Sequence, residues 1–294
     1  MLTPAFSSVA CPEWTLQTIA ANAVEFGFPA VELRTFGDGS RQFAGDPALS
    51  SHEKTLITFR DAGVSVCSIA TGNAFHHAVD PPVLGHAICD TELHVRAAKR
   101  AIDLAAAIEC PLVRVFGFML SGAGGRKASV HRIAERLIKV VDHADRTGVR
   151  IVLENGGDFS TSAEVMEILD KVTSPLLGAC YNSAVGFIAG ERPADAVTVL
   201  GNRLLAVKIK DIRAGLPVAL GSGDVDNAGL VSACMTTGLK IPMIYEWDKA
   251  WIPALASAET VLPGAARTLF AMLGNTPPAP DPSGRAPARR ALHA

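Results

Sequence analysis

The sequence has almost no net charge and no nucleotide-binding motif. Its 27 lysines and arginines nearly offset 29 aspartates and glutamates, which gives a net charge of −2 and a pI near 6.4. Such a balance provides no long-range attraction for a phosphate backbone or an anionic membrane. No strand-like run is followed by a G-x-G-x-x-G or P-loop pattern. We therefore expect neither a nucleic-acid partner nor a membrane partner.

Cysteine-based sites and targeting segments are also missing. The six cysteines are scattered, with no C-x-x-C and no Cys/His pair at zinc-site spacing. The N-terminus lacks the basic start and apolar core of a signal peptide, and no apolar run is long enough to span a bilayer. These absences favour a reduced, cytoplasmic protein whose thiols act as small core hydrophobes.

Between residues 5 and 274 the chain repeats one unit eight times: a short apolar strand, a loop, and a longer segment with helical periodicity. The expected strands cover residues 5–9, 30–34, 64–70, 112–116, 150–154, 176–181, 204–211 and 242–247. The expected helices cover residues 15–26, 51–62, 91–108, 129–147, 162–172, 193–200, 227–237 and 256–273.

Strict alternation of this length is typical of either a doubly wound sheet or an eightfold barrel. A barrel would gather polar groups at the C-terminal ends of its strands. Six expected strands carry such groups: Glu32 and Arg34, Arg114, Glu154, Asn182, Lys208 and Lys210, and Glu246. We therefore expect an α/β protein with a single (β/α)8 TIM barrel over residues 1–275. Residues 276–294 are rich in Pro, Ala and Arg and predict a disordered tail.

The seventh expected strand carries two lysines on one face. Side-chain alternation places Lys208 and Lys210 on one face and Leu205 on the other. Because a lone buried charge costs several kcal/mol or more, we expect carboxylates nearby. Glu154 and Glu246, at the ends of two other strands, are the candidates.

These residues resemble the xylose isomerase-like TIM barrels, which include sugar phosphate isomerases and epimerases. The likeness covers residues 10–15, 30–34, 153–155, 210–211, 221–226 and 245–246. Members usually hold a divalent metal, such as manganese, zinc or magnesium, with a Glu, an Asp, a His and a Glu from the last four strands. The resemblance places Glu154 and Glu246 at the first and last ligand positions. Asn182 stands at the Asp position and Lys208 at the His position.

The two substitutions argue against a metal and leave the cofactor open. A protonated lysine has no lone pair to donate, and an amide oxygen is a weaker ligand than a carboxylate. Formal charge is nevertheless conserved, because the usual ligands with a divalent ion sum to −1, as do Glu154, Glu246 and Lys208. We hypothesise that Lys208 replaces the metal, bridges the two glutamates and stays protonated beside them. If an ion binds, Glu154 and Glu246 are its remaining ligands.

The resemblance implies an isomerase or epimerase acting on a small polyol or sugar-like carbonyl compound. Glu154 and Glu246 would be the acid/base pair, and Lys208 would stabilise the enediolate oxygen. The substrate-binding candidates are Asn182, Lys210, Arg114, Glu32 and His76.

Several alternatives stay open. Lyase or dehydratase chemistry fits the same groups, and a catalytically silent, ligand-binding relative that has lost the metal site is the second function. Lys208 as a Schiff-base nucleophile would need a lowered pKa, which two carboxylates oppose. DNA-repair endonuclease chemistry needs metal ligands and a basic groove that the sequence does not provide. A homo-oligomer is compatible with a barrel of this size.

Three further features have more than one interpretation. Arg34 either serves the site or pairs with Glu32. Trp14, Trp247 and Trp251 are candidates to wall the pocket with apolar surface, and Trp14 is equally compatible with a packed core position. Residues 221–226 form a Gly-rich loop at a position where such barrels often bind phosphate, although Gly-rich loops are common.

Overall fold

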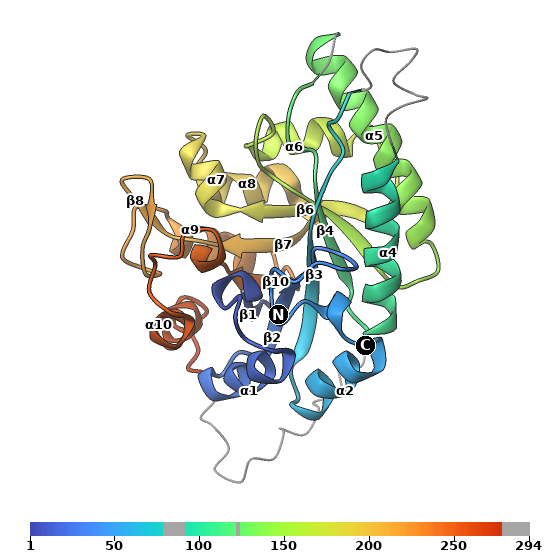
Figure 1. Cartoon of the computed structure of the whole chain (residues 1–294). Helices are drawn as coiled ribbons and strands as arrows, with labels where there is room; N and C mark the ends of the chain where they lie inside the picture. Colours follow the sequence, from blue (N-terminus) through green and yellow to red (C-terminus); the bar gives the residue numbers. More distant parts are fainter. Residues whose placement is uncertain (79–91, 122–123, 278–294) are drawn as a thin grey trace.

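The protein forms a closed barrel of parallel strands, as seen in a computed structural model that describes residues 1–78, 92–121 and 124–277 (Figure 1). The strands neighbour one another in the order β1-β10-β7-β6-β5-β4-β3-β2. They are β1 (Thr3–Ser7), β2 (Ala30–Arg34), β3 (Ser65–Ala74), β4 (Leu112–Phe116), β5 (Arg150–Glu154), β6 (Leu177–Asn182), β7 (Leu204–Ile209) and β10 (Pro242–Tyr245). The predicted (β/α)8 barrel is confirmed, and the doubly wound sheet is excluded.

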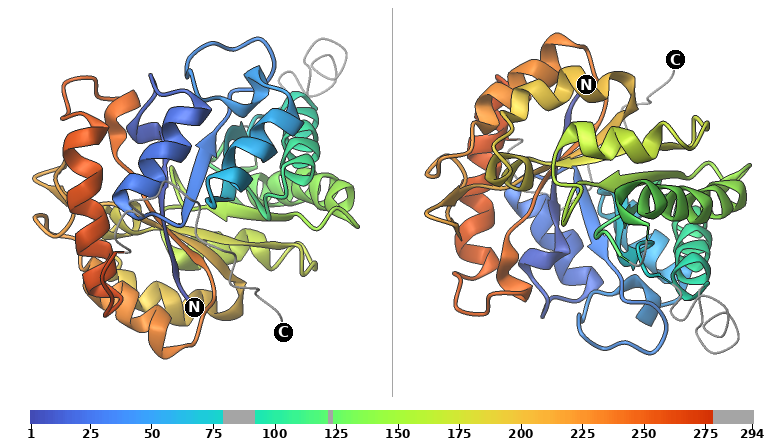
Figure 2. Two further views of the ribbon diagram at one scale, coloured as in Figure 1. Left: turned by 90° about the horizontal axis from the view of Figure 1, so that it is seen from below. Right: turned by 90° about the horizontal axis from the view of Figure 1, so that it is seen from above.

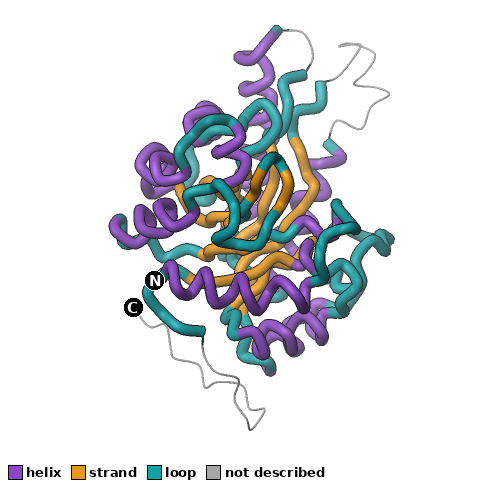
Figure 3. Tube along the Cα trace, turned by 90° about the vertical axis from the view of Figure 1, so that its left-hand side faces the viewer, coloured by secondary structure: helices purple, strands orange, loops and turns teal. Residues whose placement is uncertain are grey.

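The helices surround the barrel on the outside (Figures 2 and 3). They are α1 (Leu16–Phe26), α2 (His52–Asp61), α4 (Leu93–Ala107), α5 (Gly125–Ala144), α6 (Ser162–Leu169), α7 (Ser183–Ile188), α8 (Pro193–Leu200), α9 (Asn227–Thr236) and α10 (Ala258–Met272). Short 3-10 turns are η1 (Ser8–Ala10), η2 (Pro47–Leu49), η3 (Gly201–Arg203) and η4 (Asp248–Ala250). One continuous apolar core lies between strands and helices. No helix among the described residues is long and apolar enough to cross a membrane.

The local sequence explains where several helices begin and end. The Thr15 hydroxyl accepts from the backbone N–H of Thr18 at the start of α1, and Gly27 ends that helix in the left-handed conformation. At α6, Thr161 and Glu164 form a reciprocal capping box.

The barrel interior is filled by two layers of side chains. The lower layer is apolar and consists of Ala5, Ala30, Cys67, Leu112, Val152, Cys180, Leu205, Ala206 and Ile244. Strand side chains repeat every second residue, so the residue two positions further along a strand points inward one step nearer the C-terminal mouth. These residues form what we call the polar layer: Glu32, Arg114, Glu154, Asn182, Lys208 and Glu246, all buried. The alternation of side chains along the strands therefore places a charged layer on top of the apolar lower layer.

Leu205 departs from the expected alternation. We expected it to face away from Lys208, but it belongs to the interior apolar layer. The register between β6 and β7 shifts here, because Leu204 pairs with Ala179 while Ala206 pairs with Cys180. The extra residue is a bulge that turns two consecutive side chains inward.

Other boundaries also differ from the prediction. Strand β1 starts and ends two residues early, because the Ser7 hydroxyl accepts from the backbone N–H of Val9 and starts η1. Helix α7 and the hairpin of β8 (Ile212–Arg213) and β9 (Leu216–Pro217) were not expected, since such short elements carry no periodicity. The predicted tail falls mostly on residues 278–294, which lie outside the described residues, as does Cys89. The described cysteines are free and buried, as expected for core hydrophobes.

Candidate active site

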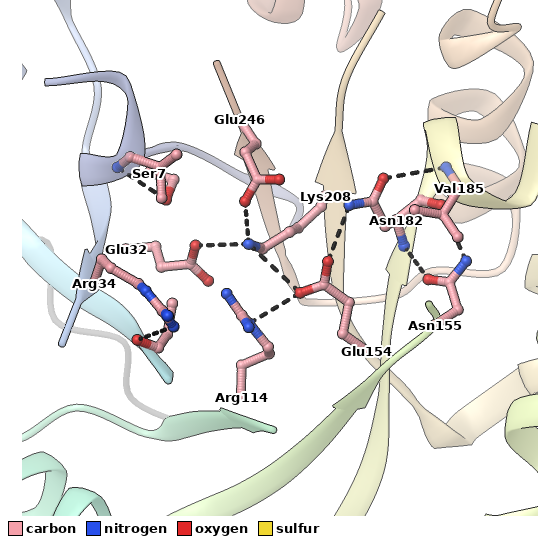
Figure 4. Close-up of polar contacts among 12 residues, drawn as sticks. Ser7, Glu32, Arg34, Arg114, Glu154, Asn155, Asn182, Val185, Lys208 and Glu246 are labelled. Atoms are coloured by element: carbon pink, nitrogen blue, oxygen red, sulfur yellow. Dashed lines mark hydrogen bonds and ion pairs between the residues drawn. The ribbon is translucent and has the colours of Figure 1, made fainter. Parts of the chain in front are cut away.

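Lys208 lies at the centre of the polar layer, where three carboxylates converge on it (Figure 4). Its Nζ is 3.1 Å from Glu32 Oε1 and 3.5 Å from Glu154 Oε2. It also donates to Glu246 Oε2. The Lys208 and Glu32 side chains are wholly buried, and the three acids come from β2, β5 and the end of β10. The predicted bridge between Glu154 and Glu246 is present, and Glu32 adds a third acid.

The field at Lys208 keeps its side chain charged. Burial and the neighbouring Arg114 act to lower the pKa of Lys208. Glu154, Glu246 and Glu32 outweigh both and raise this pKa above its usual value. The ammonium is therefore protonated at neutral pH and cannot act as a Schiff-base nucleophile without losing these partners.

Two further cations bind the acids from the outer side. Arg114 Nε is 2.9 Å from Glu154 Oε2, and its Nη1 donates to the backbone oxygen of Thr71 at 2.6 Å. Lys210 Nζ is 3.3 Å from Glu246 Oε1 and 2.8 Å from Asp248 Oδ1. Arg114 and Lys210, expected to bind substrate, are thus each paired with carboxylates.

The surroundings of Glu246 lower the pKa of its carboxyl group. Burial acts to raise its pKa, but Lys208 and then Lys210 lower it well below the usual range. The carboxylate is therefore ionised across the whole neutral range.

Asn182 connects the polar layer to helix α7. Its Nδ2 donates to Glu154 Oε1 at 2.9 Å, and its Oδ1 accepts from the Val185 backbone N–H at 3.4 Å. The Asn155 amide fixes the backbone of Asn182, accepting from its N–H at 2.6 Å and donating to its oxygen at 3.2 Å. Asn155 was missed as a site residue, although the Glu154–Asn155 pair was among the motifs.

The donor set does not fit the divalent metal of similar barrels. Lys208 places a protonated ammonium between Glu154 and Glu246, and the Asn182 amide oxygen is already used as a helix cap. Among the described residues, no three His, Cys, Asp or Glu side chains are grouped so as to hold a metal ion.

The Gly-rich loop at residues 221–226 is occupied by a carboxylate of the chain itself. The backbone N–H groups of Gly221 and Gly223 both donate to Asp211 Oδ2 at 2.9 Å, and Val225 donates to Oδ1 at 3.3 Å. A Cβ on Gly223 would lie 2.0 Å from Asp211 Oδ1, so this position requires glycine. Because Asp211 takes the amides, the loop is not a free phosphate cradle.

The ring contacts of His76 are with His77 and Phe118 and not with residues of the polar layer. Its ring is buried and packs 4.0 Å from the His77 ring and 5.9 Å from the Phe118 ring, measured between centroids. Burial, with His77 next, lowers the pKa of His76 to about 4, so the ring is neutral at pH 7. Its substrate-binding role stays a prediction.

Of the three tryptophans, only Trp251 lies exposed beside the mouth of the barrel. The Trp14 indole donates to Glu259, and the Trp247 indole donates to the backbone oxygen of Ala256, so both are packed structural residues. The Trp251 ring lies 5.9 Å from the guanidinium carbon of Arg34.

A cavity of about 530 Å³ is lined by none of the residues of the polar layer. It lies between the ends of β2 and β3 and the helices α2 and α4, where Phe36 and Gly72 form part of its wall. Glu154, Lys208 and Glu246 meet in the polar layer and do not line this cavity.

Comparisons with known proteins agree with this architecture. The model of the family "Xylose isomerase-like TIM barrel" matches residues 20–269. No curated protein matches the sequence. Three similar solved structures are an L-ribulose 3-epimerase, the IOLI protein with a bound zinc atom, and the probable 3-DHS dehydratase AsbF from Bacillus anthracis.

The epimerase is 18% identical with a TM-score of 0.76, over 93% of this chain and 95% of that one. The IOLI protein is 16% identical with a TM-score of 0.75, over 93% and 98%. The dehydratase is 16% identical with a TM-score of 0.73, over 91% and 98%. At these identities the structures establish a shared fold. Together with the family match over most of its length, they show that this chain belongs to the xylose isomerase-like TIM barrel family.

Proposed function

We propose that the protein is a proton-transfer enzyme of the sugar isomerase/epimerase type, in which the Lys208 ammonium takes the place of the divalent metal. Its substrate is a small polyhydroxylated carbonyl compound. The observation that carries the proposal is the contact of one buried lysine with three carboxylates from three strands. The sugar epimerases and the dehydratase among the similar structures support the general class.

Lys208 supplies the positive charge that such a reaction needs. Removing a proton next to a carbonyl leaves an enediolate, whose oxygen is stabilised by a fixed cation in a site shielded from water. An ammonium carries one positive charge where a metal carries two, so we expect slower turnover than in a metal-dependent relative. Dehydratase chemistry begins with the same proton removal and is open to the same groups.

Glu154 and Glu246 are the acid/base pair in this proposal. The lowered pKa of Glu246 keeps it in its basic form at neutral pH, but makes it a weak base while Lys208 and Lys210 hold it. When the enediolate oxygen binds Lys208, this cation is shared and the basicity of Glu246 rises. Asn182 adds hydrogen bonding to the substrate through the amide that now holds Glu154.

The remaining predicted substrate-binding residues are Lys210, Arg114, Glu32 and His76. Lys210 is the most exposed cation of the cluster, at 15% of its side chain. Lys210 binds a substrate hydroxyl by giving up its ion pair with Asp248. Arg114 and Glu32 act through Glu154 and Lys208, and His76 contributes from the loop after β3.

Proton exchange tests the function directly. The chelator-treated protein is incubated in ²H₂O with a panel of ketoses, aldoses and their phosphates, and ¹H NMR follows the hydrogen next to the carbonyl. We expect that hydrogen to exchange in at least one compound, and the exchange to disappear in Lys208→Met. The exposed Lys171→Met is the matched control. Exchange that requires added metal, or that survives in Lys208→Met, would contradict the proposal.

The second candidate function is a catalytically silent relative that binds a sugar-like ligand. This candidate is favoured because every carboxylate oxygen of Glu154 and Glu246 already has a partner. Glu246 has a cation on each oxygen, and Glu154 has a cation on Oε2 and the Asn182 amide on Oε1. Ligand binding without exchange in any compound of the panel would select this candidate.

A further inference from the structure

In the part of the chain that the structure describes, Arg34 is the cation at the mouth that forms no ion pair with an acid. Among the described residues, Arg114, Lys208 and Lys210 each lie within 4.0 Å of a carboxylate oxygen, whereas Arg34 forms no such pair. Glu32, two residues earlier on β2, pairs with Lys208 instead, so the expected pair of Arg34 and Glu32 does not form. The Arg34 side chain nevertheless lies beside the polar layer and is only 7% exposed (Figure 4).

One edge of the Arg34 guanidinium is free. Its Nη1 donates to the backbone oxygen of Ala70 at 3.3 Å, while the buried Nε has no acceptor among the described residues. The Phe36 ring lies 4.5 Å from the guanidinium carbon and covers its face, with Trp251 beyond at 5.9 Å. The Nε and Nη2 hydrogens point in parallel, the arrangement that binds a carboxylate through two hydrogen bonds.

Gly72 keeps space open at this same edge. A Cβ at this position would lie 3.0 Å from Arg34 Nη2, closer than an ordinary contact. The backbone of Gly72 is not left-handed, so its conformation does not demand glycine. Gly72 and Phe36, which both adjoin the Arg34 guanidinium, also belong to the wall of the 530 Å³ cavity, which Arg34 itself does not line.

The buried Nε–H of Arg34, which has no acceptor among the described residues, is costly, since an unsatisfied donor retains its desolvation penalty. Burial, and then Arg114, lower the pKa of Arg34 to about 10, because the nearby acids compensate only in part. The guanidinium remains charged at pH 7 and lacks a counterion of its own.

We propose that Arg34 binds a carboxylate of the substrate through its Nε–Nη2 edge, so that the substrate is a polyhydroxylated carbonyl acid and not a neutral sugar. This inference rests on the proposed function, since it names the substrate class for the same mouth. Phe36 and Trp251 cover the bound group, and Gly72 leaves the room for it.

The local charge favours a carboxylate over a phosphate. Glu32, Glu154, Glu246 and Asp248 carry four negative charges that offset the four cations Arg34, Arg114, Lys208 and Lys210. A carboxylate adds one negative charge to this balanced set and a phosphate adds nearly two. The second charge is repelled by the same acids.

Matched acyclic probes test the inference without turnover. Five- and six-carbon aldonates, the corresponding alditols and the alditol terminal phosphates differ only in one end group, and isothermal titration calorimetry measures their binding. We expect at least one aldonate to bind about tenfold or more tightly than its alditol, as for a hydrogen-bonded charge. Arg34→Gln should abolish the difference, and Arg34→Lys should keep only part of it.

A second variant leaves the arginine in place. Gly72→Ala adds a methyl group at the free edge and should weaken aldonate binding severalfold without changing alditol binding. Arg192→Gln, which removes an exposed arginine paired with Asp195, is the control and should bind aldonates as the unchanged protein does. If Arg34→Gln does not fold, Gly72→Ala decides the question.

Three results would overturn the inference: no aldonate preferred over its alditol, a phosphate preferred over the aldonate, or a preference that survives both Arg34→Gln and Gly72→Ala. Failure of the proposed function is a separate result. An acid preference that depends on Arg34, with no proton exchange in any compound, would refute the enzyme and leave the anion site standing. Proton exchange on neutral sugars, with no preference for the acid, would support the enzyme and refute the anion site.

Discussion

Replacing Lys208 by methionine keeps the length of the side chain and removes the cation that three carboxylates share. Two of the acids retain another partner, because Arg114 holds Glu154 and Lys210 holds Glu246. Glu32 alone loses its only cation and stays wholly buried. Removing one partner of a buried ion pair costs roughly 3–5 kcal/mol. With one acid fully stranded, we expect Lys208→Met to lower the free energy of unfolding by about 4 kcal/mol.

The pH dependence of this loss has a defined sign. In the unchanged protein the pKa of Glu246 is depressed, so its contribution to stability is present above the unfolded pKa, about 4.3, and is lost as pH falls further. In Lys208→Met, Glu32 is buried without its ion-pair partner, so the penalty is present while this carboxylate is ionised and vanishes as the acid protonates. The second effect narrows the difference in the free energy of unfolding between the two proteins as pH falls from 8 to 4, and the first effect adds to this below about pH 4.3.

Urea denaturation followed by circular dichroism measures this gap across the pH range. Lys171→Met at an exposed position should stay within about 0.5 kcal/mol of the unchanged protein. Adding Glu32→Gln to Lys208→Met should restore at least about 1 kcal/mol at pH 8, because it removes the stranded charge. A gap below about 1 kcal/mol, or one that does not change with pH, would refute the account of Lys208 as the shared counterion.

The other predictions concern the metal position and the loop after β7. Asn182→Asp combined with Lys208→His should create manganese binding detectable by calorimetry, and neither the unchanged protein nor Asn182→Asp alone should bind it; equal binding by all three would contradict our reading of the donor set. Asp211→Asn removes the charge that accepts three loop amides, and should lower the midpoint of thermal unfolding by several degrees, about 2–4 °C per kcal/mol. Gly223→Ala should destabilise at least as much, because its Cβ would meet Asp211 at 2.0 Å; an unchanged midpoint in both would refute the role of this loop.

The sequence predicted the barrel and the members of its polar layer because both follow from local regularities. Side-chain alternation brings Glu154, Lys208 and Glu246 inward, and polar residues at the strand ends indicated where the C-terminal mouth of the barrel lies. The position of Leu205 was missed, since a bulge in the β6–β7 register depends on two strands far apart in sequence. Which cation pairs with which acid also depends on three-dimensional proximity, so the sequence did not reveal that Arg34 would remain unpaired.

The hydrogen-bond partners of Asp211 and Asn155 could not be predicted from the sequence either. Asp211 was predicted to end the seventh strand, but β7 ends at Ile209. The capture of the loop amides by Asp211 depends on how residues 221–225 fold back over it. Asn155 lay in a motif that resembled the family, and only the fold shows its amide bracing the backbone of Asn182.

The central claim is that an ammonium, and not a metal ion, lies between Glu154 and Glu246. A crystal soaked in manganese and measured at a wavelength where manganese scatters anomalously tests it most directly. Our account predicts no anomalous peak at this position, with Lys208 Nζ in contact with both carboxylates. A manganese ion bound by Glu154 and Glu246, with Lys208 displaced, would contradict the account.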